Sequence, residues 1–363
     1  MKIVLFTTAL PETLFNEAGE KGIRLNPAAE NFYLRLLATF ETALECKVIT
    51  FAPSFSFDPS LYQDFVFVRR EKSRKETLRN VENAFEKLRS TFEPDVLICE
   101  SLNLALSSGA SKIFKKHNLP LVSVLTDAPE NITGASFPYR FLCKRYAKKA
   151  NAYLALTEGL LETFSAKKKP HFLFPGIVEP FQKKKPLVQG DYYYYGGALF
   201  EKDGTGSLVR AYLASNSNIP LYIAGHGPME EEIKNLAAQH PSLHLMGQLI
   251  KEENIAMEQH ATVLINPRWY REDLDSVSVP SKNLEYLSNG NRIASTPNSI
   301  LKSMFPGDVD WLPKEASEIE KSLRERFENG FQDAPINNAK EKIQDLLGYE
   351  ALGKKFLDFL LRL

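Results

Sequence analysis

Residues 278–290 read Ser-Val-Pro-Ser-Lys-Asn-Leu-Glu-Tyr-Leu-Ser-Asn-Gly, and this stretch is the most informative part of the chain. Pro280 suits the first turn of a helix, where its missing N–H group is not needed. Leu284 and Leu287 are three residues apart and would face a hydrophobic core together. Gly290 is typical of a residue that ends a helix in the left-handed conformation. The stretch therefore predicts a helix that begins near Pro280 and ends before Gly290.

Three polar residues lie near the start of this predicted helix. The free N–H groups of a helix start attract phosphate, and Ser281 and Lys282 would add a hydroxyl and a positive charge. Glu285, one turn further along, could accept hydrogen bonds from two neighbouring ribose hydroxyls. This combination favours a nucleotide, and more specifically a nucleotide-sugar. The alternative is that Lys282 and Glu285 form an ordinary solvent-exposed pair.

Composition limits the classes of protein to consider. The 363 residues are enough for two or three domains, and 44% of them are hydrophobic. Lys+Arg and Asp+Glu are equal at 45 each, so no net field directs the protein to nucleic acid. Three widely spaced cysteines indicate free thiols in a reducing compartment. No apolar run approaches the ~20 residues of a membrane span. We expect a soluble, cytoplasmic protein.

Short apolar runs alternate with helical patterns along the whole chain, which predicts parallel sheets covered by helices. A proline- and lysine-rich segment at 174–186 interrupts the alternation and predicts a hinge. We therefore expect two doubly wound domains that face each other across a cleft, with ligands at the carboxyl ends of the strands. The predicted strands are Lys2–Phe6, Lys47–Phe51, Phe65–Val68, Asp95–Cys99, Pro120–Leu125, Ala152–Leu156, Asp191–Tyr195, Ile219–Ala224, Leu243–Met246, Thr262–Asn266 and Arg292–Ser295.

Two glycine-containing turns follow strands of the second series. Gly197 lies after the tyrosine-rich strand, and Lys202 precedes the next helix. Gly225 and Gly227 flank His226 after the following strand, where they would form a wall beside a base. Small residues let a backbone approach a phosphate closely. Neither turn has the spacing of a dinucleotide fingerprint or of an NTPase loop, and glycine turns without any ligand are the alternative.

Four further residues are candidates because they lie at or near predicted strand ends or on a loop. Arg268 could reach a diphosphate with its planar fork, or lie on the surface. Thr126 and Asp127 end a buried strand of the first half, where Asp127 could face the cleft or cap the next turn. Asn26 would lie on the rim of the cleft. Asp273-Leu-Asp275 follows a polar loop instead of a strand, so we predict no metal site there and no cofactor.

Taken together, these residues resemble glycosyltransferase family 4, within the GT-B fold. The resemblance covers nearly the whole chain and is most specific after residue 190. Its first half is similar to the acceptor domains of capsular and exopolysaccharide transferases. The motifs that carry it are Asn26-Pro-Ala-Ala29, Leu125-Thr-Asp127, Leu156-Thr-Glu158, Pro175-Gly-Ile-Val-Glu179, Tyr195-Gly-Gly-Ala-Leu199, Gly204, Ile223-Ala-Gly-His-Gly-Pro228, Met246-Gly247, Asn266-Pro-Arg268 and Ser278–Gly290.

The resemblance implies an acceptor-binding domain at 1–182, completed by a C-terminal helix at about 343–363 that crosses back to it. A nucleotide-sugar domain would occupy 186–340. It also implies roles for the candidates. Glu285 would hold the ribose, Ser281, Lys282 and Arg268 would surround the diphosphate, and Gly197 and Lys202 would line its phosphate side. Asp127 would be the catalytic or acceptor residue of the first domain.

One position departs from the family pattern. Many members carry a second glutamate two helical turns before the ribose-binding one, and this chain has Val277 there. The departure leaves open a non-catalytic partner subunit of a transferase complex. An epimerase or a phosphorylase on the same fold is a third possibility.

The expected reaction moves a sugar from a nucleotide-diphosphate donor, UDP-linked by expectation, to a glycan or lipid-linked acceptor. Family likeness implies retention without a metal; in an inverting reaction Asp127 would be the general base. Basic clusters at 69–75, 144–149 and 167–169 suit a peripheral contact with an anionic membrane, or they are solvated helix faces.

Overall fold

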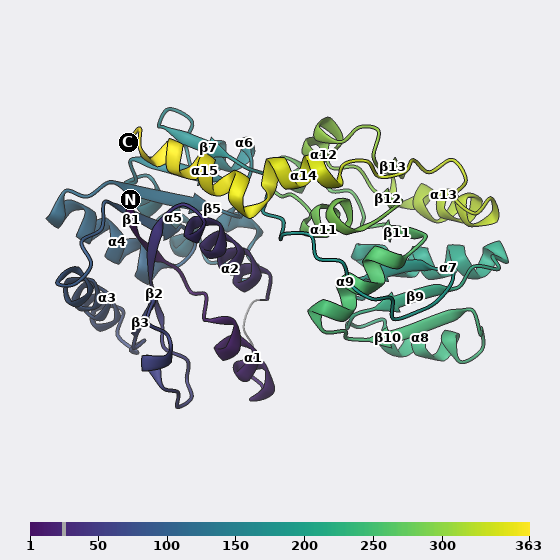
Figure 1. Cartoon of the computed structure of the whole chain (residues 1–363), viewed down its shortest axis with the longest axis horizontal. Coiled ribbons are helices and arrows are strands. Elements are labelled where there is room, and N and C mark those ends of the chain that lie inside the picture. The colour runs from purple at the N-terminus through teal and green to yellow at the C-terminus, as the bar shows by residue number, and fades with distance from the viewer. Residues whose placement is uncertain (24–26) are drawn as a thin grey trace. The chain divides into compact units, whose positions relative to one another are not determined.

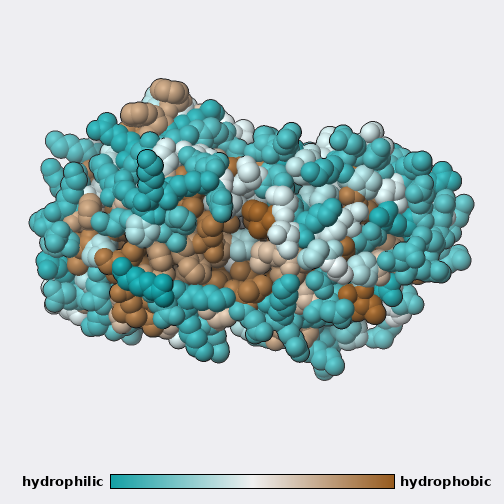
Figure 2. Space-filling view, turned by 90° about the horizontal axis from the view of Figure 1, so that it is seen from above, coloured by the Kyte–Doolittle hydropathy of each residue, from teal (hydrophilic) through white to brown (hydrophobic). Residues whose placement is uncertain are grey.

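The computed structural model describes residues 1–23 and 27–363. It divides into two compact units (Figure 1). The first unit comprises residues 1–179, 276–278 and 347–363, and the second comprises 180–275 and 279–346. The face drawn in Figure 2 is largely hydrophilic, with hydrophobic residues exposed in small groups.

The first unit is built on a seven-stranded parallel sheet with the strand order β3-β2-β1-β4-β5-β6-β7. Strands β4 and β5 are buried along their whole length, as expected for strands covered on both faces. The strands are β1 (Lys2–Phe6), β2 (Glu45–Phe51), β3 (Phe65–Val68), β4 (Val96–Glu100), β5 (Leu121–Leu125), β6 (Ala152–Ala155) and β7 (His171–Leu173). The helices of this part are α1 (Glu12–Glu20), α2 (Pro27–Glu41), α3 (Arg74–Arg89), α4 (Leu104–His117), α5 (Phe137–Ala147) and α6 (Glu158–Thr163).

The second unit contains a six-stranded parallel sheet with the order β10-β9-β8-β11-β12-β13. Its strands are β8 (Tyr193–Gly196), β9 (Leu221–Ala224), β10 (Leu243–Gly247), β11 (Val263–Asn266), β12 (Ile293–Ser295) and β13 (Asp310–Trp311). Its helices are α7 (Thr205–Ser215), α8 (Glu230–Ala237), α9 (Lys251–His260), α10 (Glu272–Asp275), α11 (Ser281–Asn289), α12 (Ser299–Met304), α13 (Ala316–Glu328) and α14 (Lys340–Leu347).

The last helix, α15 (Tyr349–Leu360), belongs to the first unit although it ends the chain. Phe356 packs its ring against Phe40, Phe172 and Phe174, with ring centroids 5.1–5.5 Å apart. Gly353 lies so close to α2 that a Cβ atom there would meet the backbone oxygen of Thr39 at 2.7 Å. These contacts close the first unit with a segment that is distant in sequence.

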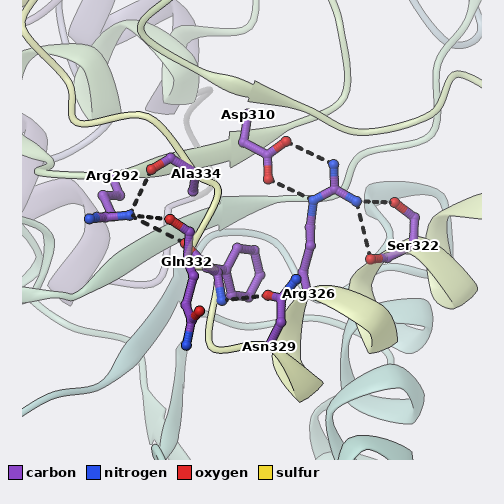
Figure 3. Close-up of polar contacts among 8 residues, drawn as sticks. Arg292, Asp310, Ser322, Arg326, Asn329, Gln332 and Ala334 are labelled. Atoms are coloured by element: carbon purple, nitrogen blue, oxygen red, sulfur yellow. Dashed lines mark hydrogen bonds and ion pairs between the residues drawn. The ribbon is translucent and has the colours of Figure 1, made fainter.

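Hydrogen bonds of Arg326 and Arg292 connect the edge of the second unit's sheet to α13 and to the turn that follows this helix (Figure 3). Arg326 donates two hydrogen bonds to the carboxylate of Asp310, at 2.6 and 2.8 Å. Arg292 donates to the backbone oxygen of Ala334 at 2.7 Å, and also to those of Phe331 and Gln332. A bidentate pair fixes direction as well as distance, so β13 and α13 are held in one arrangement.

Two other expectations concern the whole chain. Cys46, Cys99 and Cys143 are buried free thiols, as the sequence predicted. Among the residues that the structure describes, none of the helices combines the length and the hydrophobicity that a membrane crossing requires.

Candidate functional site

Helix α11 is the element predicted from residues 278–290, and its core face is as expected. Leu284 and Leu287 are buried. Pro280 precedes the first helical residue as the N-cap, one position earlier than predicted. The buried side chain of Asn283 accepts hydrogen bonds from Asn266 at 2.6 Å and Ser295 at 3.0 Å. The start of α11 is therefore tied to the carboxyl ends of β11 and β12.

Gly290 does not end the helix in the left-handed conformation, and this prediction is wrong. Its backbone is extended, with φ −75° and ψ 159°. The absence of a side chain matters for a different reason. A Cβ atom there would meet Leu264 Cδ1 at 2.5 Å and the backbone oxygen of Tyr286 at 2.9 Å. Glycine is required by close packing of α11 on β11, and not by backbone handedness.

Lys282 points from α11 to the end of β8. Its ammonium group donates a hydrogen bond to the backbone oxygen of Gly196 and lies 4.9 Å from the ring centroid of Tyr195. Burial lowers the pKa of Lys282, while the negative charges of Glu285 and Glu258 act in the opposite direction. The amino group of Lys282 therefore lies at the carboxyl edge of the second unit's sheet.

The predicted glycines explain how the lysine and two turns come together. A Cβ atom at Gly197 would overlap the Lys282 ammonium group and would lie 3.2 Å from the Tyr195 hydroxyl. Gly225, with φ +140°, passes so close to Gly197 that a Cβ atom would overlap its backbone oxygen. Gly227 is similarly close to the backbone of Leu199. The turns after β8 and β9 are thus packed backbone against backbone beside the lysine.

A pocket of about 150 Å³ opens beside the start of α11. Three predicted residues, Arg268, Ser281 and Lys282, line it. The guanidinium of Arg268 lies 3.8 Å from the carboxylate of Asp203, which the sequence analysis did not single out. The full lining is Tyr195, Ala198, Asp203, Asn266, Arg268, Pro280, Ser281 and Lys282. Two cations, a hydroxyl and a helix start in one pocket can bind a phosphate group.

Lys202 is not among the residues that line this pocket. Its side chain is exposed, and its ammonium group lies 5.3 Å from the ring centroid of Phe200. The neighbouring residue Asp203 takes the position at the pocket instead. Lys202 remains a predicted ligand-binding residue, since a flexible lysine can reorient when an anion binds.

A buried acid next to this site was missed by the sequence analysis. Glu258 on α9 is almost completely buried, and its two carboxyl oxygens accept hydrogen bonds from Asn254 at 2.7 Å and Asn289 at 2.8 Å. Tyr194 donates to Asn254 at 2.7 Å and extends the network to β8. Burial, and after it the charge of Glu285, raise the pKa of Glu258 to about 8, although the amide donors and Lys282 oppose the rise.

Glu285 lies one turn further along α11 than Lys282 and is half-buried. It is close enough to act electrostatically on both Lys282 and Glu258. Lys282 therefore interacts electrostatically with two acids, of which Glu258 is almost completely buried and Glu285 is half-buried. Glu285 is not among the residues that line the neighbouring pocket; it lies one turn further along the same helix than Lys282, which does line it.

In the first unit, Asp127 follows β5 and lies just before the short 3-10 turn at Pro129–Asn131. Its carboxylate accepts hydrogen bonds from the backbone N–H of Ala128 at 2.7 Å and from Asn131 Nδ2 at 2.9 Å. Thr126 and Asp127 are both half-buried. Asp127 therefore binds the side chain of Asn131 at the end of the turn but does not cap the turn's backbone, whose N-cap residue is Ala128. Asn26 lies outside the described residues.

A larger pocket of about 650 Å³ lies at the carboxyl ends of β1, β2 and β3 in the first unit. One wall of the pocket is the loop that follows β1, and two buried acids bind its backbone. Glu100 accepts a hydrogen bond from the N–H of Thr8 at 2.9 Å, and Glu30 accepts one from the N–H of Leu10. Burial raises the pKa of both carboxyls to about 7. The lining is Thr8, Leu10, Ala18, Ile23, Phe51, Ala52, Pro53, Ser54, Phe55, Arg69 and Arg70.

Two sequence features have structural roles. Val277 is buried within the first unit, where its Cγ1 would lie 3.1 Å from a Cβ atom built at Gly159. Asp273 pairs with Arg271, and Asp275 accepts from the backbone N–H of Ser299 at 2.9 Å. Within residues 1–23 and 27–363, no cluster of three or more His, Cys, Asp or Glu side chains has a metal-binding arrangement.

No family model and no curated protein matches this chain. Solved structures do match over essentially its whole length. The lipopolysaccharide outer core galactosyltransferase WaaB aligns with a TM-score of 0.65 and 15% identity, covering 100% of this chain and 99% of that chain. Anabaena HepE, solved in complex with UDP and glucose, aligns with a TM-score of 0.66 and 13% identity, covering 100% of both chains.

A putative UDP-N-acetylglucosamine 2-epimerase from Listeria monocytogenes is also similar, with a TM-score of 0.60, 12% identity and coverage of 98% of this chain and 94% of that chain. At these identities the comparison shows the fold alone. Two Rossmann-like units on parallel sheets of seven and six strands match the GT-B glycosyltransferase structures at full length. The predicted GT-B fold is therefore confirmed.

Proposed function

We propose that the protein is a glycosyltransferase that uses a nucleotide-diphosphate sugar, with the donor bound in the second unit. The observation that carries the proposal is the pair Lys282 and Glu285 on successive turns of α11, with Lys282 lining a pocket that also contains Arg268. The pocket binds the diphosphate through the helix start and the two cations. Glu285 accepts hydrogen bonds from the ribose hydroxyls.

Transfer of the sugar breaks the bond between its anomeric carbon and the diphosphate, so negative charge grows on the leaving group. Lys282 and Arg268 lie where that charge would develop. Their positions are fixed before the reaction, because Lys282 is held by Gly196 and Arg268 lies beside Asp203. Preorganised charge of this kind is usually the largest catalytic contribution. In the proposed mechanism these cations replace a metal ion, and EDTA leaves the rate unchanged.

The acceptor is proposed to be a glycan or lipid-linked chain bound by the first unit, as in exopolysaccharide synthesis. The larger pocket supports this assignment, because it combines apolar walls with Arg69 and Arg70 at the carboxyl edge of the sheet. Such a lining suits an acceptor with an apolar part and an anionic group. Asp127 follows β5 at the same edge of this sheet, and we propose a retaining reaction in which it positions the acceptor hydroxyl.

The proposal is tested by nucleotide release from UDP-, GDP- and ADP-sugars in the presence of oligosaccharide and polyprenyl-phosphate-linked acceptors. We expect UDP release from at least one UDP-sugar, accelerated by an acceptor. Glu285→Gln should lower kcat/KM by about 100-fold, on the scale of two lost hydrogen bonds to the donor. Glu232→Gln, at an exposed site on α8, is the matched control and should leave the rate unchanged.

The similarity to a 2-epimerase structure favours a second candidate, conversion of a UDP-sugar to its isomer. The same assay separates the two functions. An epimerase changes the sugar of a UDP-sugar without needing any acceptor, whereas a transferase leaves the donor sugar unchanged and releases UDP. A non-catalytic partner subunit, which Val277 leaves open, would bind UDP without converting any donor.

A further inference from the structure

Helix α5 of the first unit presents two large aromatic side chains to solvent. Phe137 is 80% exposed and Phe141 is 54% exposed, whereas 11 of the chain's 24 phenylalanines are buried in its core. They are four residues apart and therefore lie on the same face of the helix, one turn above the other. Both rings are thus exposed side by side on one face of α5.

The same face continues as a row of positive charge. Arg145 on α5 and Lys148, which caps the end of the helix, are exposed and follow Phe137 and Phe141 at helical spacing, so the four side chains form one stripe. The first half of this stripe is aromatic and the second half is cationic. We call these four residues the α5 stripe.

The positive charge around the α5 stripe is concentrated. Burial lowers the pKa of Lys149, and the neighbouring cations Lys115 and Arg145 lower it further. Lys144 is neutralised by Glu130, 2.6 Å away. Lys149 is thus repelled by two neighbouring cations, and an anionic partner would relieve that repulsion.

The helix itself is firmly anchored, so its exposed aromatics are not a result of fraying. Cys143 and Ala147 on the opposite face are buried. The hydroxyl of Tyr139 donates to the backbone oxygen of Leu102 at 2.6 Å. Ser136 caps the first turn by accepting from the backbone N–H of Tyr139. A rigid helix with an exposed apolar and cationic face is suited to bind a partner outside the chain.

We propose that the α5 stripe docks the first unit on an anionic lipid surface. Two aromatic rings on successive turns can enter the headgroup region, where side chains of this type partition favourably. Arg145, Lys148 and Lys149 then face lipid phosphates, and each basic residue near such a surface contributes about 1 kcal/mol. No span is required, and the attachment is reversible. The inference stands apart from the proposed function, because it concerns where the protein is and not which bond it transfers.

The position of α5 relates this attachment to the larger pocket of the first unit. The helix follows β5 and the Asp127 turn, and so begins at the carboxyl edge of the first unit's sheet. The larger pocket of the first unit opens at the carboxyl ends of β1, β2 and β3, at that same edge. An acceptor anchored in the lipid would therefore meet the first unit at the edge where its pocket opens.

Vesicle co-sedimentation tests the proposal with the full chain. Vesicles of phosphatidylcholine with about 30% phosphatidylglycerol should bind the protein at least tenfold more tightly than pure phosphatidylcholine vesicles. Raising the salt concentration to about 0.5 M should weaken that binding by about tenfold, because the Debye length falls to a few ångström. The double variant Phe137→Ser, Phe141→Ser and the double variant Arg145→Gln, Lys148→Gln should each lose at least tenfold in affinity.

Matched controls come from the same unit. Leu61→Ser removes a side chain that is 73% exposed, and Lys87→Gln with Lys354→Gln removes two exposed cations; neither variant should change vesicle binding. All variants should keep the melting temperature of the wild type. The proposal is overturned if the wild-type chain ignores anionic vesicles, or if the control variants lose as much as the α5 variants. It is also overturned if Phe137→Ser, Phe141→Ser converts a dimer in solution to a monomer, which would identify a second copy as the occupant.

Discussion

At the scale of single residues, the site depends on how three titratable side chains are arranged: Lys282, Glu285 and Glu258. Lys282 and Glu285 were predicted from their spacing, because both lie on one face near a helix start. Glu258 was not, because its helix reads Lys-Glu-Glu-Asn-Ile-Ala-Met-Glu-Gln-His and looks solvent-exposed. Only the contact with Asn289 shows that this acid is buried against α11. Sequence spacing reveals which side chains share a face, but it does not reveal which helix covers them.

The contact between Gly197 and Lys282 leads to a first prediction. Gly197→Ala places a methyl group where the ammonium group of Lys282 lies, so the lysine must leave its position beside the pocket. We expect UDP release to fall at least tenfold, in line with the loss of one preorganised cation. Calorimetry should show a melting temperature within about 2 °C of the wild type, since the lysine is a flexible neighbour.

Gly307→Ala is the control for this substitution, because Gly307 lies in the same unit and has nothing within 4 Å of the added methyl group. It should leave both the rate and the melting temperature unchanged. Equal activity of Gly197→Ala and Gly307→Ala would contradict the assigned role of Lys282.

The pKa of Glu258 leads to a second prediction, on stability. Its pKa is raised from 4.5 in the unfolded chain to about 8 in the folded protein, so the folded state holds a proton that the unfolded state has lost between these values. Stability contributed by this group is therefore complete below pH 4.5 and is lost as the pH rises toward 8. One pKa unit corresponds to about 1.4 kcal/mol.

Glu258→Gln removes the titration, so the variant should gain stability relative to the wild type as the pH rises from 5 to about 8. The difference between the two proteins is the quantity to measure, by urea unfolding at each pH, because Glu30 and Glu100 titrate equally in both. Glu252→Gln, exposed on the same helix, is the control. A difference that is independent of pH would show that Glu258 is not protonated in the folded state.

At the scale of elements, long apolar runs were predictable and short edge elements were not. Strands β1 and β3 have the predicted bounds, and the strand endings at Asn266 and Ser295 are also as predicted. The edge strands β7 and β13 were missed, because two or three residues carry no period of their own and are defined by pairing with a neighbour.

The return of α15 to the first unit leads to a third prediction. Phe356→Ala removes a ring that contacts three other phenylalanines, and we expect it to lower the free energy of unfolding by about 3–5 kcal/mol. Denaturant unfolding measures the loss. Lys354→Ala, exposed on the same helix, should change stability by less than about 0.5 kcal/mol. A small effect of Phe356→Ala would mean that α15 is not an integral part of the first unit.

At the scale of the whole molecule, the alternation of strands and helices was enough to predict two parallel-sheet units. The predicted boundary was 182–186, and the first unit of the structure ends at Glu179. Two features of the tertiary structure could not be predicted from the sequence pattern. Residues 276–278 belong to the first unit although their neighbours do not, and the pocket of the first unit is lined by five separate segments of chain. Such groupings depend on tertiary packing, which no local period records.

The binding of UDP to the second unit tests the central claim most directly. Isothermal titration of the full chain should show that UDP binds and that uridine, which lacks the diphosphate, binds at least 100-fold more weakly, on the scale of the charge-assisted bonds that are missing. Lys282→Gln should weaken UDP about tenfold or more and leave uridine unaffected, while Lys321→Gln, exposed on α13, should change neither. UDP that binds no better than uridine, or that binds Lys282→Gln as tightly as the wild type, would contradict a diphosphate site at the start of α11.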